Sequence, residues 1–273
     1  MNILVGEKLS IITAKSQTTR HRIMGVVTTD DYQIVYSDTP GVLKPVYKLQ
    51  ESMLNYSESA LEDADVILYI TDVLETKTKN KFFLEMVNRV KCPVIILVNK
   101  IDLSPSQEKV VEIINDWKTL VPKAEIYPVS ALMKFNTENI LDKIVSLLPE
   151  NPPYFEKDRL TDKPERFFVS EIIREKILLN YKEEIPYCCE VGIESFKEGA
   201  ERYDIGAVIY VMRESQKGII IGRQGAALKK VGTQARIEME DFFQKKVFLQ
   251  IYVKVDPDWR ESRRELRKFG YEE

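Results

Sequence analysis

The sequence has 273 residues, of which 44% are hydrophobic and 30% are charged, and its formal net charge is -3. A chain of this length can bury large cores, and we expect two domains rather than one. The weak net charge excludes a uniformly basic nucleic-acid-binding protein, so any site for nucleic acid must be local.

Cysteine and histidine usage excludes two further kinds of site. The sequence has three Cys, two of them adjacent at Cys188 and Cys189, and a single His, His21. These numbers fit neither a disulfide framework nor a His-rich metal site, and we interpret the cysteines as small buried side chains in a reducing compartment. No segment approaches the roughly 20 apolar residues of a membrane span, and the first residues lack a signal-peptide pattern. We therefore expect a cytoplasmic protein.

The first segments predict a helix end, a polar loop, a hairpin and a helix. Residues 2–5 are typical of the last turn of a helix that a glycine terminates. Residues 10–21 are polar and rich in hydroxyl groups, and we expect a mobile loop there. Two apolar segments, residues 23–27 and 33–36, flank a polar turn and predict an antiparallel hairpin. The apolar spacing of residues 49–61 predicts a surface helix.

Strands then alternate with helices. Strands are predicted at residues 66–70, 94–98 and 125–129, and helices at 79–90, 106–120 and 136–148, with Ser106 as an N-cap. This alternation implies right-handed crossovers and a mostly parallel sheet that helices cover on both faces. We therefore predict an α/β domain over residues 1–150.

Prolines at 149, 152 and 153 end the last of these helices, because proline cannot continue a helix. We place a linker over residues 151–165 and a second domain over residues 166–273. The second domain is predicted to have a helix at 168–182, strands at 189–196, 207–213 and 247–255, a helix-turn-helix at 217–244 and a basic tail. Three strands with helices on one side make a small α+β domain. We interpret the tail as a packed terminal helix rather than a second binding site.

The apolar strand at residues 94–98 runs directly into Asn99, Lys100, Ile101 and Asp102. Ligands of open α/β sheets bind beyond the carboxyl ends of the strands. A carboxylate there can accept two N–H groups from a guanine edge, and the Asn amide offers complementary polarity. An isolated Asn-x-x-Asp is equally typical of a helix N-cap.

Two further polar turns favour the ligand site over the cap. The strand at residues 33–36 leads to Asp38, Thr39, Pro40 and Gly41, and the strand at 125–129 leads to Ser130 and Ala131. Together with the polar loop at Gln17–His21, these turns resemble the successive motifs of a translation-factor-type GTPase. The predicted nucleotide-binding residues are Asp38, Thr39, Pro40, Gly41, Val42, Asn99, Lys100, Ile101, Asp102, Ser130 and Ala131.

The resemblance also implies roles for particular groups. Asp38 would hold Mg²⁺ through water, and Thr19 would close on the same ion. The Gly41 amide would sense the γ-phosphate, and the backbone at Ser130 and Ala131 would contact the guanine oxygen. GTP or GDP and Mg²⁺ are the cofactors that this resemblance implies, and no catalytic residue is assigned.

The sequence departs from the GTPase pattern in two places. Val42 stands where many GTPases have a water-orienting Gln, which implies slow hydrolysis or help from another group. The phosphate-binding pattern G-x-x-x-x-G-K-[ST] does not occur in the 273 residues. We hypothesise a truncated form, through a misplaced start, a fragmentary gene or a genuine deletion. We then expect weak or absent GTP binding by this chain, although it resembles a GTP hydrolase in its other motifs.

The second half contains a G-x-x-G turn, Gly222-Arg223-Gln224-Gly225, between an Ile-rich segment and a helix. Alone, this turn is typical of a tight helix–helix connection. Here two strands precede it and one follows it, and residues 213–236 contain six basic side chains against one acidic side chain. This arrangement resembles a type II KH domain, whose groove accepts about four unpaired bases. A solvated basic helix face is the alternative. The predicted RNA-binding residues are Lys217, Gly218, Ile221, Gly222, Arg223, Gln224, Gly225, Lys229 and Lys230.

A GTPase-like half followed by a KH-like half resembles the Era family of bacterial GTPases. The resemblance implies binding to the 3′ region of small-subunit (16S) ribosomal RNA and assistance in assembly of the 30S subunit, with the GTP state controlling the KH groove. It also implies loose association with the inner membrane face, and we expect a monomer. The alternatives are a nucleotide-independent KH-type RNA-binding protein and a membrane-surface protein.

Overall fold

The computed structural model describes residues 1–75 and 81–272 of the chain. Its contacts divide it into two compact units, the first of residues 1–8, 24–44 and 54–161, and the second of residues 9–23, 45–53 and 162–273. Two short segments of the N-terminal half therefore belong to the unit that is otherwise C-terminal. The predicted start of a helix at residue 79 lies outside the described residues.

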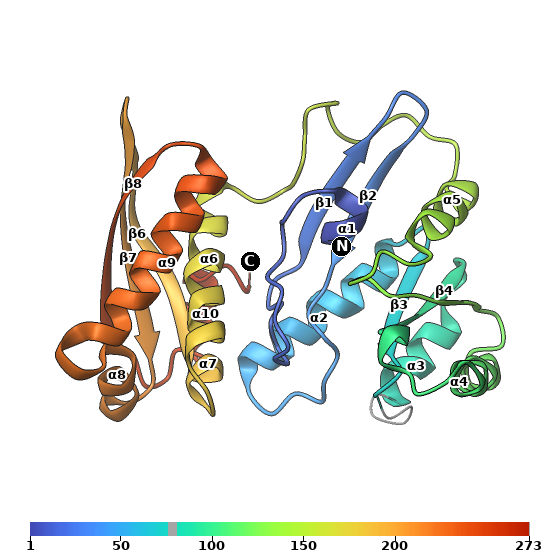
Figure 1. Ribbon diagram of the computed structural model, residues 1–273, viewed down its shortest axis with the longest axis horizontal. Coiled ribbons are helices and arrows are strands. Elements are labelled where there is room, and N and C mark those ends of the chain that lie inside the picture. The colour runs from blue at the N-terminus through green and yellow to red at the C-terminus, as the bar shows by residue number, and fades with distance from the viewer. Residues whose placement is uncertain (76–80, 273) are drawn as a thin grey trace. The chain divides into compact units, whose positions relative to one another are not determined.

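The first unit is an α/β structure (Figure 1). Its elements are α1 (Asn2–Val5), β1 (Ile23–Thr28), β2 (Gln33–Asp38), α2 (Lys48–Asp63), β3 (Ile67–Asp72), α3 (Lys81–Arg89), β4 (Val94–Asn99), η1 (Ile101–Leu103), α4 (Gln107–Leu120), β5 (Glu125–Pro128) and α5 (Thr137–Leu147), with β1 and α2 beginning in segments of the second unit. The strands β3, β4 and β5 form a parallel sheet in that order. The predicted alternation and parallel sheet are confirmed.

The central strand β4 holds this unit together because it is buried on both faces. Ile96 packs in a cluster with α3 and α4, whereas Ile95 and Leu97 pack in a second cluster with α5 and β2. Successive side chains of a strand point to opposite faces, so one run of five apolar residues contributes to two cores. Full burial of each such side chain contributes about 1.5–3 kcal/mol to stability.

Several local predictions for this unit are confirmed. Gly6 ends α1 with φ 86, in the left-handed region that glycine adopts without strain. Ser106 caps α4, with its side chain accepting a hydrogen bond from the Lys109 amide. The strands β1 and β2 form the predicted hairpin as a two-stranded sheet of their own, closed by a hydrogen bond from the Thr29 N–H to the Tyr32 carbonyl.

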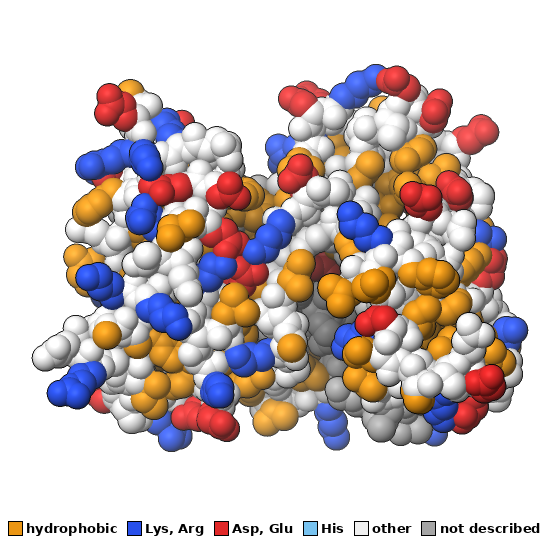
Figure 2. Space-filling view, viewed as in Figure 1, with side chains coloured by type: hydrophobic (Ala, Val, Ile, Leu, Met, Phe, Trp, Pro, Cys, Tyr) orange, Lys and Arg blue, Asp and Glu red, His pale blue; other side chains and the backbone are white. Residues whose placement is uncertain are grey.

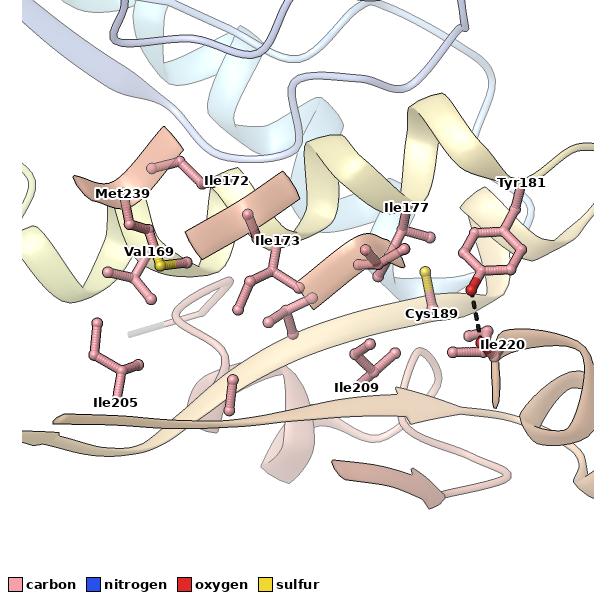
Figure 3. Close-up of a cluster of buried hydrophobic side chains, with 14 of the residues drawn as sticks. Val169, Ile172, Ile173, Ile177, Tyr181, Cys189, Ile205, Ile209, Ile220 and Met239 are labelled. Carbon is pink, nitrogen blue, oxygen red and sulfur yellow. Dashed lines mark hydrogen bonds between the residues drawn. The ribbon is translucent and has the colours of Figure 1, made fainter. Parts of the chain in front are cut away.

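The second unit is a three-stranded sheet with helices against it. Its elements are α6 (Glu165–Asn180), α7 (Ile185–Cys188), β6 (Cys189–Glu198), β7 (Arg202–Val211), α8 (Glu214–Ile221), η2 (Arg223–Gly225), α9 (Ala226–Phe243), β8 (Lys246–Val255) and α10 (Arg263–Lys268). The strand order is β6-β7-β8, with β6 and β7 antiparallel and β7 and β8 parallel. Ile173 and Ile177 of α6 face Ile205 and Ile209 of β7 in the core (Figure 3).

Three predicted elements in this unit have wrong boundaries. The helix predicted at residues 168–182 begins at Glu165 and ends at Asn180. The strand predicted at residues 207–213 begins at Arg202 and ends at Val211, because its first residues alternate apolar Tyr203 and Ile205 with polar neighbours and were not recognised as part of the strand. The helix predicted from residue 217 begins at Glu214. The packed terminal helix predicted for the tail is confirmed as α10, whose Leu266 is fully buried.

The polar loop at residues 10–21 has no helix or strand, as predicted, but it is anchored rather than mobile. Arg20 is 1% exposed, and it donates hydrogen bonds to the carbonyl oxygens of Cys189 (2.8 Å) and Pro186 (2.9 Å). It also pairs with the Glu190 carboxylate at 3.0 Å. Arg174 of α6 donates to the Thr18 carbonyl at 2.5 Å. The loop is therefore part of the second unit's interior.

His21 lies in the same anchored segment. Its ring stacks on Tyr271 with centroids 4.1 Å apart and meets the edge of Phe167 at 5.3 Å. Burial, together with the charges of Arg174, Lys163 and Arg20, lowers the pKa of His21 well below its ordinary value. His21 is therefore neutral in the folded protein at neutral pH.

This burial predicts a pH dependence that one substitution removes. Below pH 6.5 His21 is protonated in the unfolded chain but not in the folded protein. The free energy of unfolding therefore has its full value above that pH and decreases as the pH falls below it. Between about pH 7.5 and 5.5, the free energy of unfolding should fall by about 1.4 kcal/mol more in the wild type than in His21→Phe. Because His21 is the only His, the difference between the two proteins reports this group alone.

The measurement is urea unfolding followed by fluorescence of Trp259, which is fully buried in the second unit. A Trp117→Phe background removes the other Trp of the sequence, which lies in the first unit. Parallel pH curves for the two proteins would contradict the burial of a neutral His21.

Candidate functional site

Two loops meet at the carboxyl end of β4. The Asn99 Oδ1 accepts a hydrogen bond from the Ala131 N–H at 3.0 Å, and the Ser130 hydroxyl donates to the Asp102 Oδ1 at 2.6 Å. β5 is parallel to β4, which brings the loop after β5 to the same edge of the sheet as Asn99. Four of the predicted nucleotide-binding residues thus lie together, with the amide and carboxylate side chains held in place.

These contacts leave Asp102 available to a ligand. Asp102 is exposed, and only its Oδ1 is engaged by Ser130, so the other oxygen can accept N–H groups. The Ala131 N–H is donated to Asn99, although the family resemblance assigns this part of the backbone to the guanine oxygen. That assignment therefore stays a prediction.

Lys100 connects the same loop to the neighbouring strand. Its Nζ lies 2.6 Å from the Asp72 carboxylate at the end of β3, and its backbone has φ 59, a strained conformation for a residue with a side chain. Partial burial acts to raise the pKa of Asp72, but hydrogen bonds from Lys100 and from the Leu74 amide outweigh it, so the pKa lies below its ordinary value. Asp72 was missed as a site residue, although its place at a strand end next to the Asn99 strand is visible in the sequence.

The Asp38–Val42 turn follows β2 in the same unit. The Pro40 carbonyl accepts a hydrogen bond from Ser57 of α2 at 3.0 Å. Val42, at the position where many GTPases have Gln, packs against the hydrophobic cluster of β3, β4, α3 and α4. An apolar side chain in that place contributes to the core and offers no group that orients water.

Thr19 belongs to the other compact unit, in the anchored segment at residues 9–23. Its role on Mg²⁺ with Asp38 therefore stays a prediction. Within residues 1–75 and 81–272, no three His, Cys, Asp or Glu side chains are grouped as a metal site made by the protein alone. A Mg²⁺ ion bound here would need ligands from water or from a nucleotide.

The G-x-x-G turn lies between α8 and α9 in the second unit. Gly222 has φ 71, and a Cβ added there would lie 2.6 Å from the Ala227 Cβ. Gln224 (φ 51) and Gly225 (φ 76) are also left-handed, and a Cβ at Gly225 would meet open space. The Tyr181 hydroxyl donates to the Ile220 carbonyl at 2.6 Å and fixes the end of α8 (Figure 3).

A groove of about 370 Å³ lies beside this turn, between α9 and β8. Its lining residues are Gly225, Leu228, Lys229, Gly232, Thr233, Arg236, Leu249 and Ile251. Only Gly225 and Lys229 were predicted. The others were missed, although the helical spacing of 225, 229, 232 and 236 and the strand spacing of 249 and 251 both point to a single surface.

Basic side chains surround the groove. Arg223, Lys229 and Lys230 are exposed, whereas Arg236 is partly buried and pairs with Glu240 at 2.8 Å. The surface over α8 and α9 shows several Lys and Arg side chains separated by apolar and neutral ones (Figure 2). An apolar floor with cations beside it suits unpaired bases and their phosphates.

Among the helices in the described part of the chain, none combines the length and the apolar character required to cross a bilayer.

Two family models match the chain. One is described as a KH domain and matches residues 184–260, and the other is described as a 50S ribosome-binding GTPase and matches residues 1–100. The sequence is 43% identical over 273 residues to GTPase Era of Clostridium kluyveri, covering 99% of this chain and 93% of that protein. It is 44% identical over 274 residues to GTPase Era of Caldanaerobacter subterraneus, covering 99% and 92%.

Two solved structures have the same fold over nearly the whole chain. One is Era in complex with MgGDPNP and nucleotides 1506–1542 of 16S ribosomal RNA, at TM-score 0.95 and 37% identity, covering 99% of this chain and 92% of that one. The other is a variant of Aquifex aeolicus Era bound to GDP and AlF4⁻, at TM-score 0.94 and 37% identity, covering 99% and 93%. A P-loop-GTPase-type domain followed by a KH domain is therefore the fold of this chain.

Two glycines four residues apart should respond oppositely to substitution by Ala. Gly222→Ala should destabilise the second unit by about 1–3 kcal/mol, since the Cβ meets Ala227 and the backbone conformation favours glycine. Gly218→Ala lies within α8 in open space and should stabilise the helix by about 0.5–1 kcal/mol. Urea unfolding followed by Trp259 fluorescence measures both. Equal effects at the two positions would contradict the described turn.

Proposed function

Because this chain belongs to the Era family of GTPases, we propose that it is a guanine-nucleotide-dependent switch that binds the 3′ region of 16S ribosomal RNA and assists assembly of the 30S subunit. The observation that carries this proposal is that one chain holds both sites. The Asn99–Ala131 and Asp102–Ser130 hydrogen bonds hold the side chains of the predicted base site in one unit, and the groove between α9 and β8 lies in the other.

The base site supports selection of guanine by charge and geometry. Ser130 fixes the Asp102 carboxylate, which can then accept the N–H groups of a guanine edge without first losing rotational freedom. Adenine presents no matching pair of donors. When it bound, the carboxylate would lose its hydrogen bonds to water and gain none from the base. Asn99, held by the Ala131 N–H, retains its amide N–H groups as donors.

A Mg²⁺ ion bound with the nucleotide would neutralise phosphate charge. On the residue pattern, Asp38 and Thr19 would hold it, partly through water. In the nucleotide-dependent switch that we propose, the segment at residues 9–23 is the connecting element. It is continuous in sequence with the first unit at both ends and is anchored in the second by Arg20. A bound nucleotide can change the equilibrium between two arrangements of the protein only by the difference in its affinity for them.

The second candidate is an RNA-binding protein that acts without nucleotide. The observation that favours it is the absence of G-x-x-x-x-G-K-[ST] from the 273 residues, since that pattern supplies most of the hydrogen bonds to phosphate. Calorimetric titrations of this chain with GTP and with a single-stranded RNA separate the two candidates. RNA binding that GTP does not change would support the second.

The same proposal places the protein in the cytoplasm, with loose contact with the inner membrane face, as a monomer. Sedimentation with anionic vesicles tests the membrane contact, and equilibrium ultracentrifugation tests the monomer. Neither measurement depends on the nucleotide or RNA assignments.

Asp102→Asn should change the base preference from guanine towards xanthine. The substitution replaces the acceptor of the guanine N–H groups with an amide, and loss of a charged hydrogen bond costs about 1.5–3 kcal/mol. The affinity for GDP should fall by roughly tenfold to a hundredfold while that for XDP rises. The measurement is competition binding in a form of the protein that includes a phosphate-binding loop.

Asp31→Asn is the matched control, because Asp31 is an exposed residue in the β1–β2 turn. A mutant at position 102 that still prefers GDP would contradict the assignment of this loop to the base.

Arg223→Glu should weaken RNA binding by roughly tenfold and reduce the slope of log affinity against log salt by about 1. Arg223 is exposed in the G-x-x-G turn, where the substitution places a negative charge beside the phosphates. The control is Lys91→Glu, the same charge change at an exposed loop of the first unit. Fluorescence anisotropy with the 3′ segment of 16S RNA gives both quantities. An unchanged affinity would count against RNA in the groove.

A further inference from the structure

The strand β8 has two different faces. Val247, Leu249, Ile251, Val253 and Val255 pack towards the core, and two of them also line the groove. The alternate residues face the other side of the sheet, and all five are exposed. We call these five residues the outer row: Lys246, Phe248, Gln250, Tyr252 and Lys254.

The outer row is chemically regular. A cation stands at each end, an aromatic ring follows inward from each cation, and an amide lies in the middle. Phe248 is 45% exposed and Tyr252 is 57% exposed. The two rings are four residues apart, about 13 Å along an extended strand, with the Gln250 amide halfway.

The tail stops short of this row. On the same side of the sheet, Phe269 packs on Tyr210 of β7 with ring centroids 5.1 Å apart, and Lys268 lies over the Tyr210 ring at 4.5 Å. Tyr210 is paired in register with Lys254. The terminal residues therefore cover β7 up to the margin of the outer row and add cations there.

The helix α10 increases the positive charge of this side. Its six residues, Arg263–Lys268, contain four basic side chains and one acidic one, and the four basic ones are exposed. Lys254 and Lys268 are close enough to repel each other electrostatically. The nearby acids Glu194 and Glu265 offset two of the charges, at 2.6 Å from Lys254 and 3.0 Å from Lys268.

Protection of a sheet edge accounts for only part of this pattern. β8 is at the edge of its sheet, and edge strands often carry Lys because charge discourages pairing with other chains. Exposed Phe and Tyr side chains do the opposite, since they favour association. Arg202 of β7 lies over the Phe248 ring at 5.3 Å and adds a further cation beside the row. Phe248 and Tyr252 nevertheless keep 45% and 57% of their surface exposed, and this exposure needs another explanation.

We propose that the outer row is a second RNA-contacting surface, on which Phe248 and Tyr252 stack unpaired bases of a strand that continues from the groove around the edge of β8. Base–aromatic stacking is tolerant of sequence, and flanking cations hold the phosphates. Gln250 can hydrogen-bond a base edge between the two rings. This inference rests on the RNA-binding function proposed above and extends the bound segment beyond the groove.

The composition of the row favours RNA over a lipid surface. A membrane contact needs a contiguous apolar face, whereas here a polar amide separates the two rings and charges close both ends. A nucleic acid strand presents flat bases and phosphates in alternation, which matches rings and cations in alternation.

The test compares two lengths of single-stranded RNA on the full chain. An oligomer of about four nucleotides fills the groove alone, and one of about twelve can also reach the outer row. The double variant Phe248→Ala/Tyr252→Ala should lose at least about fivefold in affinity for the longer RNA and keep its affinity for the shorter one. Tyr252→Phe should bind like the wild type because the ring remains. Tyr154→Ala, at a 72% exposed aromatic of the first unit, is the matched control.

Each other outcome overturns the inference. Unchanged binding of the longer RNA by the double variant would exclude stacking on the row, and equal losses for both lengths would assign the rings to the groove or the fold. Loss of binding to phosphatidylglycerol vesicles with RNA binding intact would assign the row to a membrane. If the wild type binds neither RNA, the proposed RNA-binding function itself fails, which is distinguishable from failure of the row alone.

Discussion

Alternation of side chains along a β-strand is the constraint from which both halves of this structure follow. In β4 both faces are buried, so five apolar side chains supply two cores and no polar group can stand within the strand. The polar side chains therefore lie at and after the end of the strand, where Asn99 and Asp102 form hydrogen bonds with the loop that follows β5. In β8 one face supplies the core and the groove, and the other is left to the solvent.

The interior of the second unit depends on charges that come from far away in the sequence. Arg20 pairs with Glu190 at 3.0 Å, and the Tyr271 hydroxyl donates to the same carboxylate at 2.6 Å. A buried pair of this kind adds little net stability, but removal of either partner is costly because the other charge remains buried. In this chain the pair joins the segment at residues 9–23 to β6 within the second unit.

In the RNA binding that we propose, the groove and the outer row have different roles. The groove has glycines at 225 and 232 in its lining and suits close approach of a backbone and a few bases. The outer row has exposed rings and suits stacking that does not depend on sequence. In this proposal the groove determines which bases are selected. The outer row lengthens the bound RNA segment and raises the affinity for RNA.

The sequence by itself determined the elements whose signals are local. The apolar run of β4, the Ser106 cap, the glycine that ends α1 and the alternation of strands and helices all depend on neighbours within a few residues, and all are present as predicted. The polar turns at Asn99–Asp102 and Ser130–Ala131 could also be found, because each directly follows an apolar strand. Their mutual hydrogen bonds then follow from parallel strands ending at one edge.

Only the tertiary structure decided which distant segments share an interior. The loop at residues 10–21 was predicted to be mobile because its residues are polar. Arg20 and His21 are nevertheless buried, since distant parts of the chain supply their partners, such as Glu190, which lies 170 positions from Arg20, and Tyr271. Likewise, Arg236 and Ile251 line one groove, and Tyr252 faces away from it, because α9 packs on one side of the sheet. A polar residue becomes buried when a partner satisfies it, and the identity of that partner is a property of the fold rather than of the local sequence.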